Sequence, residues 1–322
     1  WDQTVSQRRR IRLQYDPNIT LDIRYEHQPG DTSAYHAVLR ILANDKRSLK
    51  KVKTLESLGF ARMQEKLIKG ALMRSSGVTL IAGPTGSGKS TTIAELIKWM
   101  YQANDGDINI LTVEAPIERE LPAFQSSVSD DDDRGAKEYA QAIKGTLRRD
   151  PDFLMVGEIR DPNSASAVVN GVQSGHPLIS TVHAQSAIEI VERMAGPGMQ
   201  VPAQTLGSPS FISALVYQML LPELDETTKI QLNSVAKMKE YLDEDLVQRL
   251  MQVAEDLDAA DICIRNRDDV NNPEGTSGQT ICAEVIIPDE KMLEHFRQME
   301  ITEARRHWRN MGYSKRQSRD LD

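Results

Sequence analysis

The sequence is poor in cysteine: only Cys263 and Cys282 occur among 322 residues. Two cysteines are too few for a disulfide framework or a four-cysteine zinc site, so the chain is predicted to be a reduced, intracellular protein. Both are expected to be plain apolar strand residues. Aromatic residues are also scarce, at 5% of the chain, which leaves few stacking platforms for single-stranded nucleic acid.

Positive charge and long apolar runs are also in short supply. The 39 Lys and Arg residues face 47 Asp and Glu residues, which gives a formal net charge of -8. Binding along a nucleic-acid backbone needs a basic face, so nucleic acid is not expected as a direct ligand, although a local basic channel stays compatible with this charge. The longest apolar candidate, FISALVYQMLL from Phe211, falls short of the roughly 18 residues that span a bilayer. The N-terminal WDQTVSQRRRIRL lacks the apolar centre of a signal peptide and an initiator methionine, as a fragment would.

Residues 1–45 carry short alternating apolar and polar runs. RIRLQY, LDIRYE and YHAVLRIL are separated by the turn-forming groups Asp16-Pro17-Asn18 and Gln28-Pro29-Gly30-Asp31. This pattern predicts a small antiparallel sheet, and hence a partial, β-rich N-terminal domain. The basic segment that follows predicts a linker over residues 46–54, with a solvated lysine-rich turn as the alternative.

Residues 55–205 alternate helical and strand patterns. LESLGFARMQEKLIKGALM, KSTTIAELIKWMYQAN and GAKEYAQAIKGTLRR are predicted helices, whereas GVTLIAG, NILTVEAP, DFLMVGE and PLISTVH are predicted strands. Strands separated by helices indicate an α/β fold with a parallel, helix-covered sheet.

Residues 206–322 are predicted to form a mainly helical C-terminal region. SFISALVYQMLLPEL, TTKIQLNSVAKMKEYL, DEDLVQRLMQVAEDL and DEKMLEHFRQMEITEARRHW are the predicted helices, and DICIRN and GQTICAEVII are two short strands. The basic end, RNMGYSKRQSRDLD, is a candidate docking tail, with a frayed terminus as the alternative.

The most specific motif is GPTGSGKST, which satisfies G-x-x-x-x-G-K-[ST] between a predicted strand and a predicted helix. Glycines let backbone N–H groups curl around phosphate oxygens, and the N-terminus of the helix favours their charge. Lys89 is expected to reach the β- and γ-phosphates, and Ser90 to bind Mg²⁺ through its hydroxyl. The predicted nucleotide-binding residues are Gly83, Thr85, Gly86, Ser87, Gly88, Lys89, Ser90 and Thr91.

Two glutamates end predicted strands near this loop. Glu158 follows the apolar run Phe153 to Val156 and Gly157, and Glu114 ends the run NILTV. A carboxylate at the carboxyl end of a buried strand can orient attacking water or bind Mg²⁺. Glu158 is therefore the first candidate for the catalytic acid/base and for binding Mg²⁺ through water. Glu114 alone would also suit an exposed strand end.

Five blocks make the chain resemble the secretion ATPases of type II and type IV secretion and of type IV pili. In order, they are LDIRYE...VLRIL, GPTGSGKSTT, VEAPIE, LRRDPDFLMVGEIRD and SGHPLISTVHAQSA. The block LRRDPDFLMVGEIRD is the most specific, because phosphate-loop proteins in general lack it. The resemblance covers roughly residues 10 to 290 and implies a RecA-like core preceded by a PAS-like N-terminal domain.

The resemblance also implies roles for acidic residues and one histidine. Glu158 matches the family's Walker B glutamate, and Glu114 matches the first acid of its Asp box. His183 matches the residue that faces the γ-phosphate; by itself, a lone histidine is more often a structural residue.

Four arginines match arginines that family members place near a subunit boundary. Arg24 and Arg40 match those that the smaller domain presents to the nucleotide, and Arg148 and Arg160 match further ones nearby. From the residues alone, Arg24 and Arg40 would be solvent-facing strand residues. A guanidinium supplied across an interface would couple hydrolysis to subunit movement.

Three departures from the family pattern favour a type IV secretion subtype. Ala115 replaces the Asp-box aspartate, and Met219 replaces the arginine of a Gln-Arg-Leu motif. The third departure is the lack of the zinc-binding cysteines found in many type II relatives, so zinc is not predicted. The type IVB branch, which includes plasmid-conjugation ATPases, is the preferred assignment.

The resemblance implies a cytoplasmic, homo-hexameric, Mg²⁺-dependent ATPase bound peripherally to the inner membrane. It would dock on inner-membrane platform proteins and other secretion ATPases, and power type IV secretion, conjugation or a type IV pilus. The alternatives are a RecA-like DNA translocase acting in conjugation and, given Ala115, a regulatory ATP-binding subunit with little turnover.

Overall fold

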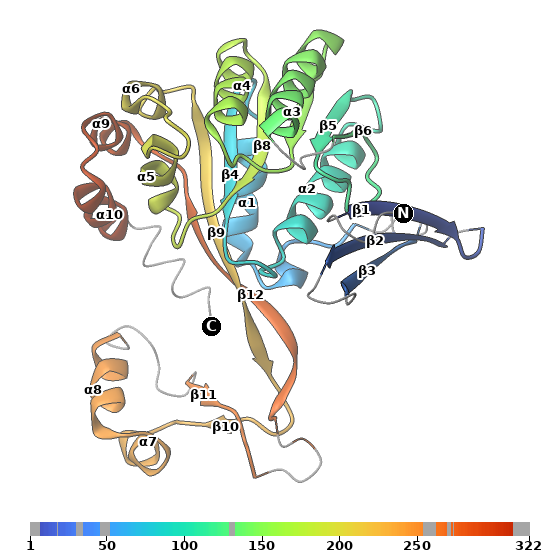
Figure 1. Ribbon diagram of the computed structural model, residues 1–322. Coiled ribbons are helices and arrows are strands. Elements are labelled where there is room, and N and C mark those ends of the chain that lie inside the picture. The colour runs from blue at the N-terminus through green and yellow to red at the C-terminus, as the bar shows by residue number, and fades with distance from the viewer. Residues whose placement is uncertain are drawn as a thin grey trace.

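The computed structural model describes residues 7–17, 19–29, 35–45, 52–128, 133–253, 262–268, 272 and 274–311. Within these residues lie a three-stranded antiparallel sheet, a seven-stranded sheet with helices on both faces, and a small lobe at the end of a two-stranded ribbon (Figure 1).

The N-terminal sheet confirms the predicted antiparallel arrangement. Strands β1 (Gln7–Gln14), β2 (Ile19–Pro29) and β3 (Tyr35–Asp45) pair in that order. Cross-strand pairing places Ile11, Ile23 and Ile41 in one row. Residues 46–51 of the predicted linker lie outside the described part of the chain.

The central sheet has the strand order β12-β9-β4-β8-β7-β5-β6, and all neighbours are parallel except β12 and β9. Its strands are β4 (Gly77–Ala82), β5 (Ile110–Glu114), β6 (Phe124–Ser127), β7 (Phe153–Val156), β8 (Pro177–Val182), β9 (Ile212–Leu224) and β12 (Thr276–Ile286).

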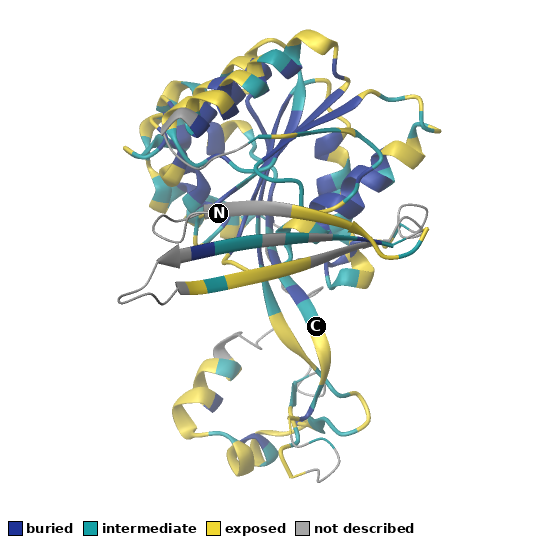
Figure 2. Ribbon diagram, turned by 45° about the vertical axis from the view of Figure 1, so that its right-hand side comes forward, coloured by how far each residue is buried: buried dark blue, intermediate teal, exposed yellow. Residues whose placement is uncertain are grey.

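Helices cover both faces of this sheet. One face packs against α1 (Arg62–Leu72) and α2 (Lys89–Ala103). The other carries α3 (Asp133–Thr146), α4 (Pro162–Gln173), α5 (Glu189–Ala195), α6 (Ala203–Leu206), α9 (Glu290–Gln298) and α10 (Ile301–Asn310). Successive residues of β4 enter opposite cores, Leu80 on one side and Ile81 on the other. Strands covered on both faces are apolar without alternation, and they form the buried centre in Figure 2.

One predicted helix is wrong throughout, because the apolar run from Phe211 forms strand β9. Periodicity cannot separate a short, fully buried strand from a buried helix. Residues Ile212 to Val216 are buried between β4 and β12, and that pairing decides their conformation. The first half of the predicted helix TTKIQLNSVAKMKEYL is wrong too, because Ile230–Gln231 is a short strand and the helix begins at Val235. The C-terminal region is therefore less helical than predicted, since β9 and β12 belong to the central sheet.

Two other predicted helices are each broken at a left-handed residue. Gly59, at φ 110°, separates a short 3-10 helix (Glu56–Leu58) from α1, and Met299, at φ 56°, separates α9 from α10. Left-handed backbone ends an α-helix, because the next turn cannot continue its hydrogen bonds. The basic tail beyond residue 311 lies outside the described residues.

Strands β9 and β12 continue past the sheet as a two-stranded ribbon (Figure 1). At its end, α7 (Val235–Tyr241) and α8 (Glu244–Val253) lie beside the short strands β10 (Ile230–Gln231) and β11 (Cys263–Ile264). This lobe has its own small core of Leu232, Met238 and Val247. Among the described helices, none combines the length and apolarity needed to cross a membrane.

Candidate nucleotide-binding site

A cavity of about 800 Å³ lies where the parallel strands end and α2 begins. It brings together most of the residues predicted from the sequence. Those lining it are Thr85, Gly86, Ser87, Gly88, Lys89, Ser90, Thr91, Glu114, Glu158, Arg160, His183 and Arg40. Strand β8 runs between β4 and β7, so His183 emerges between the phosphate loop and Glu158.

The phosphate loop is held against strand β9. Gly83 has φ 152°, and a Cβ added there would lie 2.1 Å from the backbone oxygen of Gln218. The buried side chain of Gln218 donates from Nε2 to the carbonyl of Ser87 at 2.7 Å. Gly88 also has a positive φ, of 87°, where it precedes α2. Glycine is thus required by close backbone approach at one end of the loop and by conformation at the other.

Lys89 is folded over the carbonyls of its own loop. Its Nζ donates to Gly83 O at 2.7 Å and to Pro84 O at 3.0 Å. Desolvation by burial lowers the pKa of Lys89, while the charges of Glu158 and Glu118 oppose that shift. An ammonium already taken from water in this way is well placed to exchange carbonyl partners for phosphate oxygens.

Ser90 and Glu118 form a pair that fits a divalent cation. The Ser90 hydroxyl donates to Glu118 Oε2 at 2.9 Å, and hydroxyl and carboxylate oxygens are ligands that suit Mg²⁺. The buried Ser87 Oγ has no hydrogen-bond partner among the described residues, and an added Cβ at Gly86 meets only open space. These residues could therefore hold a nucleotide phosphate and Mg²⁺.

Glu114 is a buried carboxylate held by two side chains. Its Oε1 accepts from Thr112 Oγ1 at 2.6 Å and from Gln125 Nε2 at 2.9 Å. Desolvation by burial raises the pKa of Glu114, and these hydrogen bonds oppose the rise. The neutral form of this carboxyl is therefore more favoured than in an exposed glutamate.

Glu158 is more accessible and faces His183. His183 Nε2 lies 3.1 Å from Glu158 Oε1, and the two side chains are 57% and 32% exposed. The backbone N–H of Glu158 donates to the hydroxyl of Tyr139 at 3.2 Å. Strands β7 and β5 are parallel neighbours, so Glu158 and Glu114 emerge at the same sheet edge.

The predicted arginines have different positions. Arg40 and Arg160 line the cavity, and the Arg160 guanidinium lies 5.5 Å from the Tyr139 ring centroid. Arg24 pairs with Arg40 across β2 and β3, while its side chain lies outside what the structure describes. Arg148 is exposed on the 3-10 helix Leu147–Arg149, which precedes β7 and so lies toward the opposite sheet edge.

Several cavity residues were not singled out from the sequence, Glu118, Arg119 and Tyr139 among them. Glu118 and Arg119 follow β5, and Arg119 Nη2 donates to Thr91 Oγ1 at 3.0 Å. The charged run IERE, so close after a strand that ends beside the phosphate loop, could have revealed both. Tyr139 lies in an ordinary helical pattern on α3 and gives no such signal.

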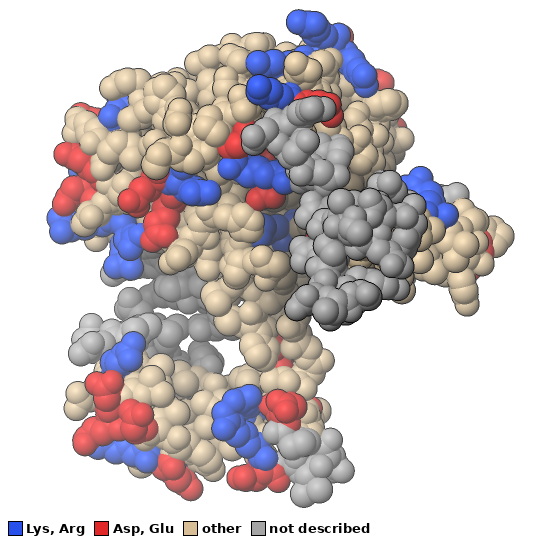
Figure 3. Space-filling model, viewed as in Figure 1, with Lys and Arg blue, Asp and Glu red and all other residues tan. Residues whose placement is uncertain are grey.

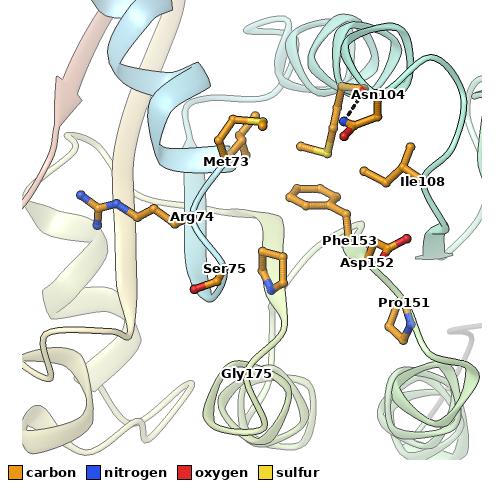
Figure 4. A pocket seen from close by; sticks show the side chains of 12 residues that line it. Met73, Arg74, Ser75, Asn104, Ile108, Pro151, Asp152, Phe153 and Gly175 are labelled. Atoms are coloured by element: carbon orange, nitrogen blue, oxygen red, sulfur yellow. Dashed lines mark hydrogen bonds between the residues drawn. The ribbon is translucent and has the colours of Figure 1, made fainter.

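A second, smaller cavity of about 320 Å³ lies at the other edge of the sheet. Phe153 and Met73 line it, whereas the side chain of Arg74 points away (Figure 4). Polar and apolar residues both line it, and most of the described residues predicted for catalysis line the larger cavity instead. The larger cavity is therefore the candidate site.

Charges of both signs are interspersed over the face of the molecule in Figure 3. Among the coloured residues on this face, neither sign forms a wide area. This distribution agrees with the net charge of -8 and shows no broad basic stripe on the viewed face.

The fold and site define a phosphate-loop nucleotide-binding protein of the α/β class. Comparison with known families identifies the branch: the family described as "Type II/IV secretion system protein" matches residues 1–320. The chain belongs to this family, as the sequence blocks predicted.

Curated relatives include pilus and type II secretion proteins. The type IV pilus assembly ATPase PilB of Pseudomonas aeruginosa is 33% identical over 226 residues, which are 68% of this chain and 37% of PilB. Type II secretion system protein E of Pectobacterium carotovorum subsp. carotovorum is 36% identical over 181 residues, or 56% of this chain and 34% of that protein. The chain thus spans about a third of the length of these relatives.

Solved structures support the fold. The pilus retraction motor PilT with bound ADP superposes with a TM-score of 0.63 at 20% identity, covering 95% of this chain and 70% of PilT. The Legionella pneumophila ATPase DotB gives 0.59 at 19% identity, covering 94% and 69%. The predicted RecA-like core with a preceding N-terminal domain is confirmed.

Proposed function

We propose that this protein is a Mg²⁺-dependent ATPase that works as a homo-hexameric motor of a secretion or pilus machine. The convergence of the phosphate loop, Glu114, Glu158 and His183 on one cavity is the observation that carries the proposal. Binding alone would need only the loop, whereas strand-end carboxylates beside it suit hydrolysis.

Each polar group has a proposed task in hydrolysis. Glu158 orients the attacking water, because its side chain is partly exposed, and Glu114 supports the water network from its buried position. Lys89 and the cavity arginines stabilise charge that develops on the phosphates. His183, at 3.1 Å from Glu158, responds to the γ-phosphate.

The site would hold Mg²⁺ through Ser90, and through water bound to Glu158. Bound Mg²⁺ supplies neutralisation of the phosphate charge. Glu118 is added to this set because it accepts the Ser90 hydrogen bond. It provides a carboxylate near the loop in a chain whose Asp box has Ala115.

The place of action is proposed to be the cytoplasmic side of the inner membrane. There the hexamer would dock on platform proteins and other secretion ATPases, with Arg24, Arg148 and Arg160 near the subunit boundaries. PilB and type II secretion protein E, named above, support a motor of this kind.

The finer assignment is type IV secretion or conjugation. It rests on the absence of a four-cysteine set, since the chain has only Cys263 and Cys282, and on the other departures from the type II pattern. Curated relatives named for type II secretion and type IV pili point to the neighbouring systems instead. The genes adjacent to the coding sequence distinguish these systems: conjugation or type IV secretion genes support the assignment, and pseudopilin genes contradict it.

Substitution of Glu158 tests the proposed activity. Glu158→Gln should bind ATP with unchanged affinity and lose about 10²-fold or more in steady-state phosphate release, because the amide cannot accept a proton. Lys89→Ala is the matched control and should weaken ATP binding itself. Near-normal turnover by Glu158→Gln would remove Glu158 from this role, and absence of turnover by the unsubstituted protein would favour a regulatory subunit.

A further inference from the structure

Tyr139 is a buried titratable residue at the cavity that the proposed chemistry does not use. It lies on α3, its side chain is 1% exposed, and it lines the nucleotide cavity. A tyrosine hydroxyl that is buried needs hydrogen-bond partners. The partners of this hydroxyl are backbone groups of two different strand ends.

The hydroxyl of Tyr139 bridges β5 and Glu158, which lies two residues beyond the end of β7. It donates to the carbonyl of Val113 at 3.2 Å and accepts from the backbone N–H of Glu158 at 3.2 Å. Val113 directly precedes Glu114, so one hydroxyl contacts the backbone beside both candidate catalytic carboxylates. Burial raises the pKa of Tyr139 to about 12, so the hydroxyl keeps its proton and can make both bonds at neutral pH.

The residues on either side of Glu158 are fixed independently. The N–H of Gly157 donates to Val113 O at 2.8 Å, and Thr181 Oγ1 donates to Gly157 O at 2.7 Å. The N–H of Ile159 donates to Thr181 O at 2.9 Å. Neighbouring strands therefore hold residues 157 and 159, and the amide of residue 158 between them is held by the tyrosine.

The side chain of Tyr139 is closely packed at both its hydroxyl and its ring. A Cβ added to Gly157 would lie 3.4 Å from the Tyr139 hydroxyl oxygen. Arg160 lies over the ring, with its guanidinium carbon 5.5 Å from the centroid. The hydroxyl is thus close against the strand end that leads into Glu158.

We propose that Tyr139 is a positioning residue that sets the place of the Glu158 carboxylate relative to Glu114 during ATP hydrolysis. This inference rests on the proposed function, since it assigns Tyr139 to the same site. A phenylalanine would fill almost the same volume but would leave the Glu158 N–H without this acceptor. The strand end could then shift, and a misplaced catalytic group slows the reacting step more than it weakens binding.

Tyr139→Phe tests the proposal through the split between turnover and binding. We expect kcat for ATP hydrolysis to fall about 10-fold or more, while KM and the affinity for ATP stay within about twofold. Tyr101→Phe removes the same hydroxyl from an exposed site on α2 and should leave kcat unchanged. A Tyr139→Phe kcat within about twofold of the unsubstituted protein, or a raised KM with unchanged kcat, overturns the proposal.

The Glu158→Gln background shows whether the tyrosine acts through Glu158. There, Tyr139→Phe should cause no further loss of turnover, because effects that share one group are not additive. An equal fold-loss in both backgrounds contradicts the positioning role.

Hydrogen exchange separates this inference from the proposed function. The Glu158 amide should exchange faster in Tyr139→Phe than in the unsubstituted protein without any nucleotide, and the Val156 amide serves as an internal reference. Unchanged exchange at Glu158 overturns the inference even if ATP hydrolysis is confirmed. Faster exchange in a protein without ATPase activity would support the contact and reject the proposed function instead.

Discussion

Glu114 and Glu158, the two carboxylates proposed for catalysis, have opposite surroundings. Glu114 is 6% exposed and accepts hydrogen bonds from Thr112 and Gln125, whereas the side chain of Glu158 is 32% exposed beside His183. A carboxylate that orients the attacking water must be accessible to water, whereas a carboxylate that supports the water network from a buried position need not be. The burial difference therefore agrees with the different tasks proposed for the two residues.

The buried position of Glu114 should make stability depend on pH. Because its native carboxyl has a raised pKa, the native state binds this proton more tightly than the unfolded state does. This group therefore lowers stability as pH rises from the ordinary glutamate pKa, about 4.3, through the raised native pKa. Glu114→Gln should be more stable relative to the unsubstituted protein at pH 7 than at pH 4, as measured by urea denaturation at each pH, while turnover falls.

Glu223→Gln is the matched control, since this glutamate is exposed on the ribbon. Its stability difference from the unsubstituted protein should stay constant between the two pH values. If the stability difference between Glu114→Gln and the unsubstituted protein is equally constant, burial of Glu114 does not make stability depend on pH.

Sequence patterns predicted the site residues that belong to contiguous motifs. The phosphate loop, Glu114, Glu158 and His183 follow strands whose ends meet by topology, so their convergence could be foreseen. Tyr139 and Gln125 could not, because each contacts the site only through its side chain, from a segment without a distinctive pattern. Long-range contacts of this kind leave no periodicity in the sequence.

The predicted elements of the core were largely confirmed, whereas β9 was not. Its residues from Ile212 to Val216 are apolar at every position because both of its faces are covered, and a continuous apolar run of this length also suits a buried helix. Pairing with β4 and β12 decides between strand and helix, and the residues of these two partner strands lie far from β9 along the chain.

The most specific sequence block, LRRDPDFLMVGEIRD, ends at Asp161, the residue that caps helix α4. Asp161 Oδ1 accepts from the N–H groups of Asn163 at 2.8 Å and Ser164 at 2.9 Å, and Pro162 occupies the first helical position. Loss of such a cap costs about 0.5–2 kcal/mol. Asp161→Ala should therefore lower the free energy of unfolding by about 1 kcal/mol, measured by urea denaturation.

Asp161→Ser provides the comparison, because a serine hydroxyl can also accept from the first helical turn. It should recover most of the loss. Equal destabilisation by the alanine and serine variants would show that capping is not the reason for aspartate at this position.

The arrangement of the N-terminal sheet and the core bears on how subunits of the proposed hexamer would cooperate. Family resemblance implies that Arg40 reaches a nucleotide at a subunit boundary, yet here it lines the cavity of its own chain. Mixed hexamers of Lys89→Ala and Arg40→Ala subunits should consequently show no more ATPase activity than the two variants measured apart.

Action of Arg40 across a boundary would give the opposite result, since a Lys89→Ala subunit would lend its intact arginine to a neighbouring Arg40→Ala site. Recovered turnover in the mixture would then place Arg40 in trans. Mixing each variant with the unsubstituted protein verifies that subunits exchange between rings.

The contact between Gln218 and the phosphate loop also links the loop to the β9–β12 ribbon, so a rotation of β9 at Gln218 would move the far end of the ribbon. Gln218 donates a hydrogen bond to the Ser87 carbonyl. Strand β9 continues for six residues beyond Gln218, about 20 Å of strand, to Leu224. A slight tilt of β9 at Gln218 moves the lobe of α7 and α8 further than it moves residues near Gln218, because displacement grows with distance from the pivot. A small shift of β9 around a bound phosphate would therefore displace this lobe further than it displaces the phosphate loop.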